Sequence, residues 1–413
     1  MRNYNKYDFL VILTLATLAW GNNEAFRFLY PIRLIGFAGL FITAMNWKLI
    51  SVQYRKWIPL FLIWGLYTIF SLVWTPDTGE GVIQAFHIIT MFGAIGLMMV
   101  SSIKAKNPLS SIVLGWAAMV LITLPIAFWE LRTGNHLSSG AYNADSMSYG
   151  QLRVFAAVTF GNLNGYAVVL ASALPFILTG WIGDKKETPF RIVLIVLTVL
   201  MAGILLLNAS RGCLLCLVIG LLFMLMLQMK GKSSIMRVAL IIGVFAFAVY
   251  YAVEKLQMDM FFEITARMEN EGMESGRLDI YKAGLEAASH SAFLGGGVGC
   301  TVPYMKAFTT CSIKVTHNAY LEILIEYGIL IFLFFWTKFY TSALSLWKSD
   351  NIKVKLIGSY FVVATVILFS VDDYYTGESV IWLFAASLIV LSNLYGKKRQ
   401  RRKTPTHTKP LSK

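Results

Sequence analysis

A histidine, an asparagine and two glutamates stand at the start of one of the most apolar stretches of the chain. They are His317, Asn318, Glu322 and Glu326 in THNAYLEILIEYG, which runs directly into ILIFLFFW. The last three are four residues apart, so on a helix they form one stripe with His317 at its outer end. An imidazole, with an unperturbed pKa of about 6.5, suits proton removal from a hydroxyl at neutral pH. Either glutamate could orient His317, although a helix places both below it.

This stripe is costly if the helix crosses a membrane. A helix that starts at 318 places Glu326 about 12 Å below its outer end. Sliding the helix outward moves Lys338 toward the middle of the bilayer instead. An ionisable group at the bilayer centre costs roughly 2.5–3.5 kcal/mol, so one of the two charges must face protein, water or the interface. The alternative, a helix with two wet turns above the bilayer, explains Glu322 better than Glu326.

Two arginines are candidates for binding phosphate. Arg211 stands in LLLNASRGCLLCL, where the connection between two apolar runs is very short, and Arg277 opens an amphipathic pattern in MESGRLDIYKAGLEAA. The planar guanidinium can donate two hydrogen bonds to phosphate oxygens at once. As alternatives, Arg211 is an anchor at the membrane interface, and Arg277 forms a solvated salt bridge to Glu274 or Asp279 worth under about 1 kcal/mol.

The segment 153–178 contains GNLNG within apolar sequence. Irregular backbone at membrane depth is tolerated where it borders a cavity or is buried in protein. We therefore expect a helix break that lines a polar chamber, with Asn162 and Asn164 pointing into it. Arg153 and Asp372 are expected on the same outer face and are further candidates. The GGGVG at 295–299 fits neither glycine signature of a nucleotide-binding loop.

The four cysteines fall into two pairs. Cys213 and Cys216 lie within an apolar run at helical spacing, which favours packing. Cys300 and Cys311 lie in a long loop that we place outside, where disulfides are permitted, and we hypothesise that they form a bridge just before His317. The five histidines are scattered and no His/Cys cluster has metal-ligand spacing, so we infer no metal and no cofactor.

The elements that must position these residues are membrane-spanning helices. The chain is 57% hydrophobic and 14% charged, with a mean hydropathy of +0.64. Apolar runs long enough to cross a hydrocarbon core of roughly 30 Å recur along it. The sequence predicts an all-α integral membrane protein with about twelve spans, near 9–20, 28–45, 57–74, 82–100, 111–129, 154–181, 191–207, 213–229, 236–253, 318–341, 354–371 and 379–395.

The charges predict the orientation of these spans. With both termini inside, the inside segments hold most of the 36 Lys and Arg residues, whereas most Asp and Glu lie outside. Residues 1–253 then form nine spans, 254–316 a large and partly helical outside loop, and 317–395 three more spans. The tail 396–413 carries KKRQRRK, which we interpret as a topology anchor and not as a nucleic-acid-binding segment.

Four segments together resemble the O-antigen ligase and polymerase superfamily of bacterial envelope glycosyltransferases. They are FGNLNGYA, SRG, GRLDIYKAGLEA followed by GGGVG, and HNAYLEILIEYG, and they occur in the family order over roughly residues 150–330. The chain has Leu163 where relatives often have proline between the two asparagines.

The resemblance implies a GT-C-like, metal-independent and inverting enzyme. It would move a glycan from undecaprenyl pyrophosphate to an acceptor hydroxyl, on lipid A-core or on a growing polysaccharide, at the periplasmic face of the bacterial inner membrane. His317 would act as general base, and Arg211 and Arg277 would hold the pyrophosphate. Partners would be the lipid-linked donor, the glycan acceptor and membrane lipids, with no nucleic acid. The remaining candidates for substrate binding are Arg153, Asn162, Asn164, Asn318, Glu322, Glu326 and Asp372.

Three alternatives stay open. A polymerase differs from a ligase mainly in its acceptor, and the compact chain slightly favours the ligase. A transporter of lipid-linked sugars would bind the same carrier without bond chemistry, but it predicts charges in the middle of several spans. A scaffold protein leaves the outer-face arginines and histidine unexplained.

Overall fold

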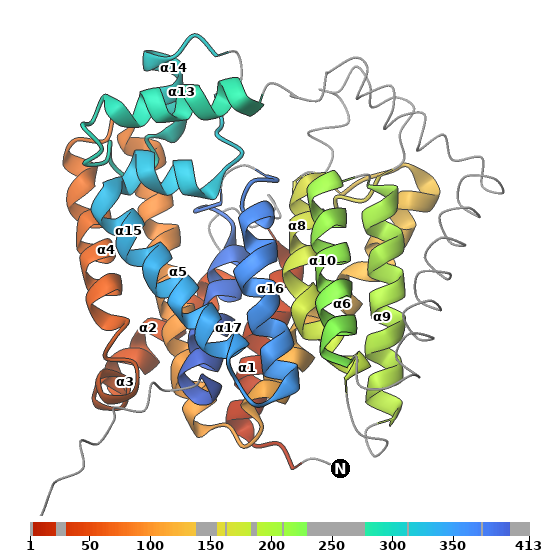
Figure 1. Cartoon of the computed structure of the whole chain (residues 1–413). Helices are drawn as coiled ribbons and strands as arrows, with labels where there is room; N and C mark the ends of the chain where they lie inside the picture. The colour runs from red at the N-terminus through yellow and green to blue at the C-terminus, as the bar shows by residue number, and fades with distance from the viewer. Residues whose placement is uncertain are drawn as a thin grey trace, which may run out of the picture.

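The computed structural model describes residues 3–21, 30–137, 155–161, 163–182, 188–208, 210–228, 277–311, 314–372 and 375–396 (Figure 1). Its regular elements within these ranges are all helical. They are α1 (Lys6–Ala16), η1 (Thr17–Trp20), α2 (Pro31–Met45), α3 (Trp47–Gln53), α4 (Ile58–Phe70), η3 (Ser71–Val73), α5 (Thr78–Lys104), α6 (Pro108–Thr133), α8 (Leu163–Ile177), η5 (Leu178–Trp181), α9 (Thr188–Leu207), α10 (Arg211–Gln228), α13 (Arg277–Ser289), α14 (Thr301–Phe308), α15 (Ala319–Trp347), α16 (Ile352–Leu368) and α17 (Ser379–Tyr395).

The described helices agree with an all-α integral membrane protein. Five of them are long and apolar enough to cross a membrane, namely α5, α6, α8 with η5, α9 and α15, and a sixth candidate is the pair α2 and α3, which is bent by 84°. Shorter apolar helices cover Ile58–Val73, Arg211–Leu227 and Ser379–Tyr395. These helices are compatible with the predicted twelve spans but do not confirm that number, and the span predicted at 236–253 lies outside the described residues.

Small residues allow two of the helices to pack at backbone contact. A Cβ on Gly36 of α2 would stand 2.2 Å from the carbonyl oxygen of Thr90, and one on Gly93 of α5 would stand 2.0 Å from the carbonyl oxygen of Gly36. In lipid there is no hydrophobic driving force for helix association, so membrane helices associate through close packing of this kind. Helices α13 and α14 lie across one end of the bundle, and α3 and the N-terminus lie at the other (Figure 1).

Helix α15 is broken at Gly328, nine residues after its first residue Ala319. Gly328 has φ 74° and ψ 177°, which is not helical. The GGGVG loop takes the place of the interrupted hydrogen bonds, because Gly296 N–H donates to Ile325 O at 2.7 Å and Gly297 N–H donates to Glu326 O at 3.1 Å. In return, Ile329 N–H donates to the carbonyl oxygen of Phe293 at 2.8 Å. The GGGVG loop therefore stabilises the break in α15 through backbone hydrogen bonds.

Replacement of Gly328 by alanine is expected to destabilise the protein. The backbone conformation at 328 is one that glycine alone adopts readily, and a Cβ there would stand 2.4 Å from the carbonyl carbon of Leu294. Strain and overpacking together should lower the free energy of unfolding by on the order of 3 kcal/mol. Thermal unfolding in detergent measures this change.

Gly203→Ala is the matched control. A Cβ at Gly203, inside α9, has no atom within 4 Å, so alanine should leave stability unchanged or raise it by up to about 1 kcal/mol. Equal unfolding midpoints for the two variants would contradict the strained break at Gly328.

Candidate functional site

The centre of the candidate site is the turn Phe369–Asp372, called here the 369–372 turn. Ala319 N–H, at the start of α15, donates to Phe369 O at 2.8 Å. The guanidinium Nη1 of Arg277, the first residue of α13, donates to Ser370 O at 2.7 Å. The turn therefore joins the His317 segment to the Arg277 segment, although 40 residues of sequence separate them.

Two further helices begin against the same turn. A Cβ on Gly212, the second residue of α10, would stand 2.5 Å from the Cγ2 atom of Val371. A Cβ on Gly165, in the first turn of α8, would stand 3.2 Å from the Oδ2 atom of Asp372. Thus α8, α10, α13 and α15 all begin around the 369–372 turn. Each helix N-terminus carries a partial positive charge, so the arrangement favours an anionic ligand.

The three predicted catalytic residues all lie at or just before the N-terminus of a helix. Arg211 is the first residue of α10 and is exposed, Arg277 is the first residue of α13, and His317 precedes the N-cap of α15. His317 is half-buried and has φ 46°, a left-handed conformation that is uncommon for residues other than glycine. Such conformations concentrate at functional sites. The fold therefore brings these residues to one end of the bundle.

Asn318, predicted to bind substrate, caps α15. Its Oδ1 atom accepts hydrogen bonds from Tyr320 N–H at 2.9 Å and from Leu321 N–H at 3.2 Å. The Thr316 hydroxyl donates to Asn318 O at 3.1 Å and fixes the backbone on both sides of His317. An N-cap of this kind is worth about 1 kcal/mol. The contacts thus give Asn318 a role in starting the helix next to His317.

Glu322, predicted to bind substrate, makes hydrogen bonds within the protein, and its contact with a substrate stays a prediction. Glu322 is 3% exposed and accepts Tyr375 N–H and Thr376 N–H, each at 2.8 Å, as well as the Thr376 hydroxyl. The Gln84 amide donates to the same hydroxyl at 2.7 Å. The carboxylate therefore holds the connection between α16 and α17. It is a positioning residue for the 369–372 turn.

Glu326 also makes a hydrogen bond within the protein, and its contact with a substrate stays a prediction. It is 3% exposed, and its Oε1 atom accepts the Thr301 hydroxyl at 2.8 Å. Its Oε2 atom has no hydrogen-bond partner among the described residues. The carboxylate faces protein beneath the GGGVG loop. An ionisable group at this depth in the helix must face protein, water or the interface, and here it faces protein.

Tyr375 fastens the 369–372 turn from inside and was missed by sequence reasoning. Its hydroxyl donates to Leu368 O at 2.7 Å and accepts Val371 N–H and Asp372 N–H, each at 2.8 Å. Burial, with the Asp372 carboxylate nearby, raises the pKa of Tyr375, so the phenol stays neutral and can donate. The only available signal was a tyrosine in DDYYTGE between two apolar runs.

Replacement of Tyr375 by phenylalanine is expected to loosen this turn. The change removes one donor and leaves two buried N–H groups without an acceptor, at about 1–3 kcal/mol for each unsatisfied group. Stability should fall, and the activity that depends on the position of Arg277 should fall with it. Thermal unfolding and a transfer assay measure the two effects.

Tyr281→Phe on α13 is the control, because Tyr281 is half-buried and has no hydroxyl contact of this kind among the described residues. Equal behaviour of both variants would refute the role of Tyr375 in holding the turn.

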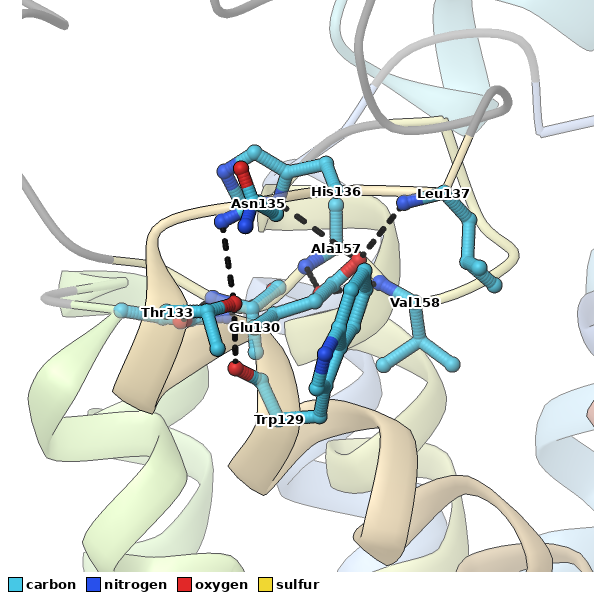
Figure 2. A network of polar contacts seen from close by, with 10 residues as sticks. Trp129, Glu130, Thr133, Asn135, His136, Leu137, Ala157 and Val158 are labelled. Carbon is cyan, nitrogen blue, oxygen red and sulfur yellow. Dashed lines mark hydrogen bonds and ion pairs between the residues drawn. The ribbon is translucent and has the colours of Figure 1, made fainter.

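The segment 155–161, just before α8, is held by two buried side chains that sequence reasoning also missed. Glu130, fully buried in the last turn of α6, accepts Ala157 N–H and Val158 N–H, both at 2.8 Å (Figure 2). A carboxylate is unfavourable at a helix C-terminus, so these donors compensate for its position. His136 Nδ1 lies 3.5 Å from Glu130 Oε1, a distance at which it forms an ion pair only when protonated. The signal was the acidic residue that ends the apolar run at 129.

Asn208 links this segment to α10. Its Oδ1 atom accepts Ala156 N–H at 2.9 Å, and its Nδ2 atom donates to Ala156 O at 2.7 Å and to Leu163 O at 3.2 Å. Asn208 is fully buried, and Arg211 follows three residues later. The amide therefore fixes the start of α10 beside the start of α8, and Arg211 with it.

In the described residues, the span predicted at 154–181 is helical only from Leu163 onward, and a helix break at GNLNG stays a prediction. Residues 155–161 are not helical, Val158 has φ 55° and Gly161 has φ 74°, and α8 begins at Leu163. Asn164 is half-buried in the first turn of α8. Asn162 and Arg153 lie outside the described residues. The polar chamber predicted here stays a prediction.

The hypothesis of a Cys300–Cys311 bridge is corrected, because both cysteines are free. Cys300 is buried and directs its Sγ atom to Ile325 O at 3.7 Å. Helix α14, about 12 Å long, lies between the two cysteines in the chain, whereas a disulfide needs Cα atoms within about 7 Å. Burial, together with the nearby Glu326 carboxylate, raises the pKa of the Cys300 thiol, which makes it unreactive.

Among the described residues, no group of His, Cys, Asp and Glu side chains is arranged to hold a metal ion.

Together, the fold and the site define a multi-span helical membrane protein with an arginine- and histidine-bearing centre at one end of its bundle. Residues 195–336, from α9 into α15, match the family described as O-antigen ligase. This match covers about a third of the chain and supports its resemblance to the O-antigen ligase and polymerase superfamily, whose members are glycosyltransferase-like ligases or polymerases. The matched part contains SRG, GRLDIYKAGLEA, GGGVG and HNAYLEILIEYG, whereas FGNLNGYA precedes it. No curated protein matches the chain significantly.

Proposed function

We propose that this protein transfers a glycan from undecaprenyl pyrophosphate to an acceptor hydroxyl at the end of the bundle that carries α13 and α14. The observation that carries the proposal is the meeting of Arg211, Arg277 and the His317 segment around the 369–372 turn. Two guanidinium groups and four helix N-termini make this end suitable for a diphosphate. An imidazole beside them supplies the base that an acceptor hydroxyl needs.

The reaction is a direct displacement. The acceptor oxygen attacks the anomeric carbon of the donor sugar, and a ring nitrogen of His317 takes the hydroxyl proton. The bond between the anomeric carbon and the pyrophosphate oxygen breaks, and undecaprenyl pyrophosphate leaves with the bonding electrons. Arg211 and Arg277 stabilise the charge that grows on the leaving group. One displacement inverts the anomeric configuration, and the protonated histidine returns its proton to solvent.

The membrane orientation follows from charge. The opposite end of the bundle carries Lys48, Arg55, Lys56, Lys104, Lys106, Lys348 and Lys355. Short loops rich in lysine and arginine stay in the cytoplasm, so the candidate site faces the periplasm of the inner membrane, with both termini cytoplasmic. No nucleotide is needed there, because the lipid pyrophosphate is already an activated leaving group.

Reconstitution of the purified chain tests the function. Vesicles would receive the protein, a lipid-linked oligosaccharide and either lipid A-core or a second lipid-linked repeat unit, and products would be resolved by gel and mass spectrometry. We expect a glycan joined to lipid A-core, as for a ligase. Product only with the second repeat unit would indicate a polymerase. Movement of the donor across the vesicle membrane without any new glycosidic bond would identify a transporter and overturn the proposal.

A further inference from the structure

A cavity of about 520 Å³ lies at the end of the bundle opposite the 369–372 turn. Residues of the connection between α3 and α4, of the C-terminal half of α15 and of the end of α17 line it. Its volume falls within the roughly 300–1,000 Å³ of small-molecule sites. No residue assigned above to the glycosyltransferase site lines it, so the cavity is separate from the proposed reaction.

Three cations from distant parts of the chain line this cavity. They are Arg55 and Lys56 before α4 and Lys338 on α15. Among the described residues, no carboxylate lines the cavity, and none of the three cations forms an ion pair with a described carboxylate. The Lys338 ammonium lies 4.8 Å from the ring centroid of Phe334, which partly shields it from lipid. Like charges gathered without counter-charge favour an anion, and phosphate is the anion that arginine and lysine bind together.

The remaining polar groups shape the cavity more than they add charge. The Tyr54 hydroxyl, in a side chain that is 1% exposed, has no hydrogen bond of ordinary geometry and neighbours the Asn393 amide. The hydroxyls of Thr341 and Ser345 donate to their own helix, at 2.7 Å to Thr337 O and 2.7 Å to Ser342 O. The three cations are therefore the groups that would bind the anion.

One stripe of α15 connects this cavity to the hydrocarbon region. Leu330, Phe334 and Lys338 follow one another at spacings of four residues, and Ser345 continues the same face. Leu330 is 76% exposed and Trp347, at the end of the helix, is 38% exposed, as expected for a lipid-facing side chain and an interfacial aromatic. An acyl chain can lie along this stripe while its headgroup reaches Lys338. This geometry favours a membrane lipid over a soluble phosphate.

We propose that the cavity binds the phosphate headgroup of an anionic phospholipid from the leaflet at this end of the bundle. Arg55, Lys56 and Lys338 hold the phosphate, and the acyl chains lie along α15 toward Leu330. Basic pockets between membrane helices on the cytoplasmic side are suited to such headgroups. The inference does not depend on the reaction catalysed at the other end.

Lipid binding to the full chain in detergent tests the proposal. Native mass spectrometry would follow titration with phosphatidylglycerol, with zwitterionic phosphatidylcholine and with soluble glycerol phosphate. The pocket variant combines Arg55→Gln, Lys56→Gln and Lys338→Gln, and the control combines Lys48→Gln, Lys106→Gln and Lys348→Gln, which are exposed at the same end and do not line the cavity. Each removed charge should lower the affinity about five-fold, so the pocket variant should bind phosphatidylglycerol roughly 100-fold more weakly than the wild type. The control should bind as the wild type does.

Equal weakening in both variants would show a general surface-charge effect and overturn the proposal, as would equal binding of the two phospholipids. Glycerol phosphate that binds as tightly as the lipid would overturn the lipid assignment in favour of a soluble phosphate. Thermal unfolding without added lipid shows whether the pocket variant is folded. If it is not, Ser342→Leu fills the cavity from α15 without a change of charge, and it should also weaken phosphatidylglycerol binding.

Discussion

His317→Ala is expected to lower the rate of glycan transfer by roughly 10²- to 10⁴-fold, the range for loss of a general base. His317 directly precedes the N-cap of α15, and Ala319 N–H ties that N-terminus to the 369–372 turn at 2.8 Å. Alanine leaves the Asn318 cap in place, so the loss should be in turnover and not in stability. The rate with reconstituted lipid-linked donor and acceptor, together with thermal unfolding, separates the two.

The histidine test has a matched control and a way to distinguish a base from a ligand. His290, exposed just beyond α13 and stacked on Phe308 at 4.0 Å between ring centroids, lies at the same end of the molecule, and His290→Ala should keep wild-type activity. If proton transfer is the lost step, added imidazole should restore part of the activity of His317→Ala, and acidic medium should slow the wild type. Full activity of His317→Ala would refute its role as base.

Arg211→Ala should lower transfer by roughly 10²- to 10³-fold, as for loss of one donor to a developing anion. Arg211 is exposed at the first position of α10, whose own N–H groups point toward the same anion. Arg211→Lys should recover only part of the rate, because an ammonium cannot reproduce the two parallel donors of a guanidinium. Initial rates over a range of donor concentrations measure both variants.

Arg132→Ala is the control for this charge, since Arg132 is exposed in the last turn of α6 at the same end of the bundle. A double variant adds a sharper test. If Arg211 and Arg277 hold one diphosphate, the loss in the double variant should be smaller than the sum of the two single losses, expressed as free energies. Additive losses, or wild-type rates for Arg211→Ala, would contradict a shared anion site. Arg277→Ala alone is less clean, because it also removes the bond to Ser370 O.

The sequence by itself indicated the membrane class, the places of the described helices and the family that residues 195–336 resemble. Hydropathy is a local property, because an apolar run of about 20 residues has few favourable environments other than a bilayer. Each predicted span that falls on described residues contains a helix, including the short runs that became α10, α16 and α17. The SRG, GRLDIYKAGLEA and HNAYLEILIEYG segments likewise indicated the superfamily that residues 195–336 match. The GNLNG segment likewise predicted irregular backbone, and α8 begins within it, at Leu163.

Only the tertiary structure decided what the buried polar groups do. Glu322 and Glu326 have the spacing of a ligand stripe, but their partners are Thr376 and Thr301, which no helical pattern predicts. Gln84 meets Thr376 across 292 residues of sequence, and Asn208 and Glu130 hold a segment whose neighbours are equally remote in the chain. A buried carboxylate must find its donors wherever the fold brings backbone N–H groups, and that depends on helix packing, not on local pattern. The same packing buried Cys300 against α15, apart from Cys311, and assembled the basic cavity at the other end from residues that the sequence alone had assigned only to membrane topology.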